Sequence, residues 1–304
     1  MDTSHFIEAS PGIRLNFVDW GQGKPLVLLH GWPFDLQSFE YQLMALPEQG
    51  IRCLAYDRRG FGRSTKAWQG YDYDTLSDDL AAFLERLDLN DVTLAGFSFG
   101  TGEVVRYFTR HGGKRVSKVG LISSVVPLLS RTSDNAYGID RSVFDDMIGK
   151  LRADRPNVLT SFIKQVFGAG VLRLSVSSAY LDWARYLCMQ ASPKATIDCL
   201  RILFETDFRA AMGAINVPTL VIHGDADKTA PLAATGAQAA RLIPNSRFLT
   251  YAGAPHGLFY TDKDKVNQDL ADFVLGRDLR AEIDPRASEL AAGANLSEIG
   301  LPIS

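Results

Sequence analysis

Cysteine, net charge and long apolar runs are all scarce in this chain of 304 residues. Its three cysteines, Cys53, Cys188 and Cys199, lack the spacing of a metal site or a disulfide framework, so we expect buried, reduced thiols. A formal net charge of -3 provides no basic surface for nucleic acid or an anionic membrane. No uncharged apolar run reaches the ~20 residues of a membrane-spanning helix, and the longest candidate, residues 119–129, is interrupted by serines and a proline.

The beginning of the chain also lacks the apolar core of a secretion signal, because charged residues recur through it. We therefore expect a cytoplasmic protein. The composition is 46% hydrophobic and 22% charged, which is typical of a globular protein with a sizeable core. No metal-binding set is evident, and the glycines of residues 21–23 lack the strand-to-helix context of a dinucleotide loop, so we expect neither a metal nor a cofactor.

The stretch around which the chain is organised is residues 92–101, with the segment that follows it. Residues 92–95 are an apolar run typical of a buried strand, and the pattern of residues 102–111 predicts a helix. Between them, Gly96 and Gly100 flank Ser98 and leave the room that a strained serine needs at a sharp strand-to-helix turn. We therefore expect the Ser98 hydroxyl at the carboxyl end of a strand and beside the positive end of a helix, where a nucleophile would stand.

Strands and helices alternate on both sides of this stretch. Residues 5–20 are expected to form two short strands, and Ser38 is expected to cap a helix that reaches residue 49. Apolar runs and helical spacing predict further strands at 26–29, 53–56, 119–122, 219–223 and 247–251, and helices at 75–87, 231–242 and 263–275. Strands separated by such helices imply right-handed crossovers and an α/β fold with a doubly wound, mostly parallel sheet.

The pattern changes between residues 127 and 214, where four helical stretches, at 141–151, 159–167, 178–189 and 193–204, occur without a strand of the preceding kind. We interpret residues 127–214 as a helical cap inserted into a core formed by residues 1–126 and 215–276. Residues 277–304 come after a complete fold and are interpreted as a C-terminal extension.

A serine nucleophile needs a histidine base, and that base needs a carboxylate to hold its tautomer. His256 lies in a loop directly after the last predicted strand, so its ring would stand at the same sheet edge as Ser98. Surface or structural roles are expected for the other histidines: His5, His30, His111 and His223.

The carboxylate is expected in the loop after the strand at 219–223, which offers Asp225 and Asp227. One of them would hold the turn. We assign the turn to Asp225 and the orientation of His256 to Asp227, although spacing alone does not decide between them. The chain order Ser98, Asp227, His256 is that of the α/β-hydrolase fold.

An oxyanion hole requires two backbone N–H groups, one of them from the residue after the nucleophile. That residue is Phe99, and Trp32 in the loop after the strand at 26–29 is the second candidate, because Pro33 has no N–H. Arg58 and Arg59 are expected to hold a tight loop by internal ion pairs, not to take part in catalysis.

The chain resembles the cofactor-free haloperoxidase and arylesterase group of the α/β-hydrolases. The resemblance covers nearly all of residues 5–276 and supports Ser98, Asp227 and His256 as a triad with Trp32 and Phe99 as oxyanion donors. It is carried by six motifs in order: HGWPFDLQSFE, YDRRGFGRS, GFSFGTGEVVRY, LISSVVP, HGDADKTAP and APHGL.

The resemblance implies hydrolysis of small aryl and alkyl esters, formation of peracids from hydrogen peroxide and a short carboxylic acid, and a homo-oligomer. Trp32 followed by Pro33 is similar to the loop of the peroxide-using members. Thr101 departs from the group, in which a glycine is more usual at this position. The expected pocket residues are Pro33, Val125, Phe144, Phe162 and Thr229.

Several alternatives stay open. The same triad would serve a lactonase or a lactam amidase, and a ligand receptor could keep the fold and triad with negligible turnover. A haloalkane dehalogenase or an epoxide hydrolase would need a carboxylate nucleophile, and Ser98 stands at that position.

Overall fold

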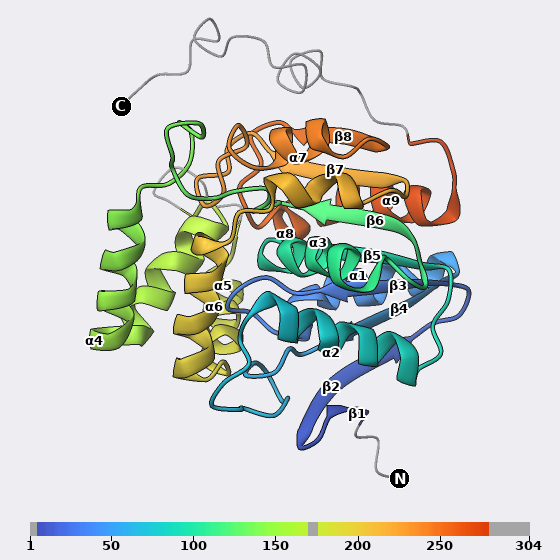
Figure 1. Cartoon of the computed structure of the whole chain (residues 1–304), viewed down its shortest axis with the longest axis horizontal. Coiled ribbons are helices and arrows are strands. Elements are labelled where there is room, and N and C mark those ends of the chain that lie inside the picture. Colours follow the sequence, from blue (N-terminus) through green and yellow to red (C-terminus); the bar gives the residue numbers. More distant parts are fainter. Residues whose placement is uncertain (1–4, 170–175, 280–304) are drawn as a thin grey trace, which may run out of the picture.

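The apolar runs become the centre of an eight-stranded sheet with the strand order β1-β2-β4-β3-β5-β6-β7-β8 (Figure 1). The computed structural model describes residues 5–169 and 176–279. β1 and β2 pair antiparallel, β2 joins β4 antiparallel, and all later pairs are parallel. The strands are β1 Phe6–Ser10, β2 Ile13–Trp20, β3 Lys24–Leu29, β4 Ile51–Tyr56, β5 Val92–Phe97, β6 Val116–Ile122, β7 Thr219–Gly224 and β8 Ser246–Tyr251.

The helices of the core connect these strands. α2 contacts α3, and α1 contacts α9. β4 lies on one side of β3 in the sheet and β5 lies on the other, so the direction of strand addition reverses after β4. With right-handed crossovers, this reversal places α1 on one face of the sheet and α2 and α3 on the other. The bounds are α1 Glu40–Ala45, α2 Tyr73–Arg86, α3 Phe99–His111, α7 Gly236–Leu242, α8 Leu258–Thr261 and α9 Lys263–Leu275, with short 3-10 turns at Leu36–Phe39, Pro47–Gln49 and Arg209–Ala214.

This reversal matters because ligands of open α/β sheets bind outside the carboxyl ends of the strands where the order changes direction. Here β3 lies between β4 and β5, and the loops after β3 and β5 contain Trp32 and Ser98. The fold therefore brings the predicted nucleophile and one predicted oxyanion donor to the same edge.

Three further helices lie beyond this edge: α4 Arg141–Val166, α5 Ser178–Met189 and α6 Pro193–Glu205. Figure 1 shows them grouped at the end of the sheet toward which β6 points. They fall within the predicted cap 127–214; its division from the core 1–126 and 215–276 stays a prediction. Of the predicted extension 277–304, only residues 277–279 belong to the part that the structure describes.

One local prediction is wrong and another is confirmed. The segment around Ser38 is capped by Asp35, whose side chain accepts from the Gln37 N–H, while the Ser38 hydroxyl donates to the Asp35 carbonyl. The two helices expected at 141–151 and 159–167 are confirmed as the two halves of α4, which are separated by a kink where Asp154 leaves the helical conformation, with a proline at 156. Proline is tolerated there because Asp154 leaves the helical conformation and Pro156 begins the next helical segment.

The three cysteines are free and buried. None of the helices within the described residues is both long and apolar enough to cross a membrane.

Candidate active site

Ser98 occupies a strained turn between β5 and α3, with φ 52° and ψ -117°. A Cβ at Gly96 would lie 2.6 Å from the Gly100 carbonyl carbon, and a Cβ at Gly100 would lie 2.5 Å from the Leu29 carbonyl oxygen. Glycine is therefore required at both positions for the turn to pack against its surroundings. The Ser98 N–H donates to the Ile122 carbonyl at 2.9 Å, which ties the turn to the end of β6. The strain is consistent with a functional position.

His256 reaches Ser98 from the loop after β8. Its Nε2 lies 2.9 Å from Ser98 Oγ, and its Nδ1 lies 2.6 Å from Asp227 Oδ2. Because an ionised carboxylate only accepts, Nδ1 carries the proton and Nε2 is left to accept from the serine hydroxyl. The Ser123 hydroxyl donates to the His256 carbonyl at 2.7 Å and fixes the loop. The geometry is that of a serine hydroxyl poised to transfer its proton to a base.

Asp227 is held by four groups. Its Oδ1 accepts from the backbone N–H groups of Thr229 and Ala230, both at 2.8 Å. Its Oδ2 faces His256 and also His223, whose Nε2 is 3.1 Å away. Burial alone would raise the pKa of Asp227, but attraction to His256 and the hydrogen bonds from both histidines outweigh it and lower the pKa. The carboxylate is therefore ionised at neutral pH and able to stabilise a charged His256.

The turn assignment of Asp225 is wrong. Asp227 itself closes the local turn through Oδ1, in addition to contacting His256. Asp225 instead accepts from the Gly253 N–H at 2.5 Å and joins the loop after β7 to the loop after β8. The prediction failed because it gave each aspartate one role, whereas a carboxylate has two oxygens that can serve different partners.

The backbone N–H groups of Trp32 and Phe99 are the predicted oxyanion donors. Phe99 is the first residue of α3, where the helix leaves its N–H groups without an internal partner. Within residues 5–169 and 176–279, neither N–H donates a hydrogen bond. A Cβ at Gly31 would lie 3.2 Å from Ser98 Cβ, so Gly31 lets the loop that holds Trp32 pack directly beside the serine.

His30 shapes this loop, as expected from its position. Its Nε2 lies 3.1 Å from the Arg58 N–H, and its Nδ1 lies 2.9 Å from the Gly31 carbonyl and 2.9 Å from Arg58 Nη1, so the ring joins the Gly31 peptide to the loop of Arg58. The same peptide unit carries the Trp32 N–H, and its orientation is thereby fixed. Burial, and then the charge of Arg58, lower the pKa of His30 well below its ordinary value, so the ring is neutral.

The loop of Arg58 and Arg59 does not hold itself together by internal ion pairs. Arg58 pairs with Glu103 on α3, and Arg59 pairs with Asp79 on α2, where Nε and Oδ2 are 2.6 Å apart. Both arginines are buried. They bind the loop after β4 to the helices that flank it, and such partners could not be read from a local sequence pattern.

Thr101, the unusual residue after the glycine of the turn, connects two loops of the site. Its hydroxyl donates to the Ser98 carbonyl at 2.6 Å and lies 3.3 Å from the Val125 N–H. A glycine at this position could make neither contact.

A cavity of about 120 Å³ opens over Ser98. Four of the five predicted pocket residues line it: Val125, Phe144, Phe162 and Thr229. Pro33 does not, although Trp32 before it does. The lining residues that the sequence did not reveal are Leu129, Ile139, Val143, Met147, Gln165, Leu200 and Leu203.

Helical spacing in the sequence could have indicated part of this lining. Val143 and Met147 lie one helical turn apart, as do Leu200 and Leu203, so each pair shares a helix face. Only the folded cap shows that these faces turn toward Ser98. The Trp32 indole N–H donates to the Thr196 carbonyl of α6 at 2.8 Å and so joins the predicted cap to the loop after β3. No group of three or more metal-ligating side chains occurs among the described residues.

Most of the chain is similar to proteins of known family. The family described as the alpha/beta hydrolase fold matches residues 24–263. A non-heme chloroperoxidase of Kitasatospora aureofaciens is 37% identical over 265 residues, covering 86% of this chain and 96% of that protein. A bifunctional esterase/perhydrolase of Acinetobacter calcoaceticus is 34% identical over 277 residues, covering 88% and 99%.

Solved structures agree. The crystal structure of a bromoperoxidase from Bacillus anthracis is similar with a TM-score of 0.86 and 39% identity, covering 90% of this chain and 100% of that one. The predicted fold and the resemblance to the haloperoxidase group are therefore confirmed.

Proposed function

The chain belongs to the α/β-hydrolase family of enzymes, and we propose that it is a serine esterase that cleaves small carboxylic esters through an acyl-enzyme. The observation that carries the proposal is the continuous contact from Ser98 Oγ through the His256 ring to Asp227. Related proteins named as a non-heme chloroperoxidase and an esterase/perhydrolase support it.

In the first half of the reaction, Ser98 Oγ attacks the ester carbonyl while its proton passes to His256 Nε2. The strained backbone of Ser98 keeps the hydroxyl at the carboxyl end of β5, and Asp227 stabilises the imidazolium that forms. The Trp32 and Phe99 N–H groups donate to the tetrahedral oxyanion. His256 then protonates the leaving alkoxide or phenoxide, and the acyl group remains on Ser98.

In the second half, water loses a proton to His256 and attacks the acyl carbon. The bond from the acyl carbon to Ser98 Oγ then breaks, Ser98 Oγ takes the proton back from His256, and the acid is released. Hydrogen peroxide in place of water would release a peracid by the same steps, and the peracid would oxidise halide in free solution. Relatives named as a non-heme chloroperoxidase and a bifunctional esterase/perhydrolase support this second activity.

The cavity indicates the size and character of the substrate. Its volume is about 120 Å³, and apart from Ser98 its walls are mainly apolar, with Gln165 and Thr229 as polar exceptions. Trp32 and Phe162 meet edge to face with their centroids 5.0 Å apart and narrow the space. A short acyl chain or a single aromatic ring suits such walls better than a charged or extended group.

The same arrangement could open a lactone or a lactam, and a receptor with negligible turnover would also keep it. Measurable turnover of an ester, a lactone or a lactam would exclude the receptor. A cytoplasmic location and assembly into a homo-oligomer stay expectations.

The test compares initial rates on p-nitrophenyl acetate and p-nitrophenyl butyrate for the wild type, Ser98→Ala and Ser77→Ala. Ser77 is a buried serine of α2 whose hydroxyl donates to the Asp74 carbonyl, so it controls for loss of a buried hydroxyl elsewhere. We expect Ser98→Ala to lose a factor of ~10³ or more and the control to stay near the wild type.

A parallel bromination of monochlorodimedone in acetate and peroxide should lose activity in the same variant. Undiminished esterase rates in Ser98→Ala would refute the triad, and an inactive wild type would favour the receptor.

A further inference from the structure

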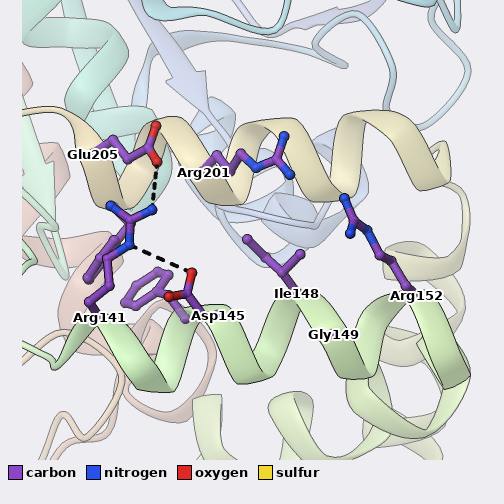
Figure 2. A pocket seen from close by; sticks show the side chains of 9 residues that line it. Arg141, Asp145, Ile148, Gly149, Arg152, Arg201 and Glu205 are labelled. Carbon is purple, nitrogen blue, oxygen red and sulfur yellow. Dashed lines mark hydrogen bonds and ion pairs between the residues drawn. The ribbon is translucent and has the colours of Figure 1, made fainter.

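A second cavity lies in the cap, in the groove between α4 and α6. Its volume is about 310 Å³, larger than that of the cavity over Ser98. Figure 2 shows Arg141, Ile148 and Arg152 rising from α4 toward α6, while Arg201 and Glu205 lie along α6. The lining residues are Arg141, Phe144, Asp145, Ile148, Gly149, Arg152, Arg201, Phe204 and Glu205.

The two ends of this cap groove differ in charge. At one end, Arg141 is neutralised by Asp145, 3.6 Å away, and by Glu205, 3.2 Å away. At the other end, Arg152 of α4 rises toward α6, and Arg201 extends along α6 in its direction (Figure 2). Across residues 5–169 and 176–279, neither of these two arginines has a carboxylate partner. The cationic charge of this end is therefore unbalanced.

Most of the lining of the groove is polar, and its apolar part consists of Ile148 between the ends and of two rings, Phe144 and Phe204, at the Arg141 end. Ile148 lies between the two helices in Figure 2. Phe144 and Phe204 stack with their centroids 3.6 Å apart and an interplanar angle of 29°. A ligand that satisfies both halves of the groove would need an anionic head and an apolar tail. Guanidinium groups match carboxylates geometrically, because both are planar and can form two parallel hydrogen bonds.

We propose that the cap groove binds small organic carboxylates with an aryl or alkyl tail. The carboxylate pairs with Arg152 and Arg201, and the tail packs on Ile148 and the ring pair. Both guanidinium groups are exposed to solvent, so the attraction is screened by salt and the affinity is moderate.

The groove is linked to the cavity over Ser98 by one side chain. Phe144 lines both spaces. Its stacking partner, Phe204, lines only the groove. A ligand tail that moves the stacked rings of Phe144 and Phe204 therefore also moves Phe144 in the wall of the cavity over Ser98. The relevance of this link to catalysis rests on the proposed function. Ester hydrolysis releases carboxylic acids and peracid formation consumes them, and such acids are the ligands proposed for the groove.

Two neighbouring residues of α4 allow the spaces to be observed separately. Ile148 lines the groove only, and Met147 lines the catalytic cavity only. Their methyl groups, labelled with carbon-13, would be followed by NMR during titration with benzoate and hexanoate, and with benzamide as the neutral counterpart of benzoate. The titrations would use the wild type, Arg152→Gln/Arg201→Gln, and the control Lys150→Gln/Lys164→Gln, which removes two exposed charges of α4 outside the groove.

We expect both carboxylates to shift the Ile148 methyl signal saturably in the wild type and in the control. The double arginine variant should bind them about tenfold more weakly or worse, and added salt should weaken binding in the wild type. Benzamide should leave the Ile148 signal nearly unchanged. An Ile148 signal that never moves, a shift of equal affinity in the arginine variant, or a response of Met147 alone would each overturn the proposal.

Repeating the titration with Ser98→Ala separates this proposal from the proposed function. Binding in the groove needs no turnover, so the Ile148 response should persist in that variant. An inactive wild type with a normal Ile148 response would refute the esterase and leave the binding site standing.

Discussion

Replacement of His223 tests the support behind the triad. The ring is fully buried, and its Nε2 lies 3.0 Å from the Ala230 carbonyl and 3.1 Å from Asp227 Oδ2. Both partners only accept hydrogen bonds, so Nε2 must carry the proton and donate. Within the described part of the chain, Nδ1 has no hydrogen-bond partner. His223 is therefore a positioning residue for Asp227 and acts on His256 only through that carboxylate.

A hydrogen bond to a charged group contributes ~1.5–3 kcal/mol to stability. His223→Leu removes one of the four donors of a buried carboxylate, so we expect the free energy of unfolding to fall by about that amount at pH 7. We also expect kcat/KM on p-nitrophenyl acetate to fall about tenfold, because Asp227 is then held less firmly against His256. His223→Gln keeps an N–H near the Nε2 position and should recover a large part of both losses.

The pH dependence supplies a second readout. The lowered pKa of Asp227 contributes stability that is present above the unfolded carboxyl pKa of ~3.9 and is lost as the pH falls through the folded value. Loss of the His223 donor raises that folded pKa, so acid unfolding should begin at a higher pH in His223→Leu. Urea unfolding and acid titration by circular dichroism measure both effects. A leucine variant as stable and active as the wild type, or a glutamine variant as impaired as leucine, would refute the reasoning.

Three further changes have defined outcomes. Gly100→Ala would place a Cβ 2.5 Å from a carbonyl oxygen of β3, so we expect kcat to fall at least about tenfold, with Gly149→Ala, whose Cβ meets nothing within 4 Å, as the active control. Burial, and then the charge of Asp57, raise the pKa of Asp35 to about 8, so its contribution to stability is lost as the pH rises from ~4 toward that value. Between pH 5 and 9 the free energy of unfolding should therefore fall less in Asp35→Asn than in the wild type, by at least about 1.4 kcal/mol. Thermal unfolding at each pH measures this, and an equal fall in both proteins would contradict the prediction. Asp225→Ala removes the acceptor for the loop after β8 and should lower the melting temperature more than it lowers kcat, which a larger loss of kcat would contradict.

The sequence was most informative where local chemistry dictates the structure. The continuous apolar runs could only be buried strands, and the glycines at 96 and 100 indicated a tight turn before any contact was known. The residues of the proposed triad each follow a strand, so their meeting at one sheet edge could be predicted from the sequence.

The sequence was least informative where partners come from distant elements. Nothing near Arg58 indicates that Glu103 of α3 neutralises it, and nothing near Asp227 indicates that it would also face His223. The residues that line the cavity over Ser98 and the cap groove depend on how α4 and α6 pack, which helical periodicity does not specify. The role of Asp225 was misjudged for the same reason, because its partner Gly253 lies in another loop.

The most direct test of the central claim is to find the acyl group itself. The wild type, quenched in acid during turnover of p-nitrophenyl acetate, would be digested and its peptides mapped by mass spectrometry, with His256→Ala as a variant that should accumulate the adduct more slowly. The account predicts one acetyl group, attached to Ser98. An acetyl group on another residue, or steady turnover without any adduct on Ser98, would contradict it.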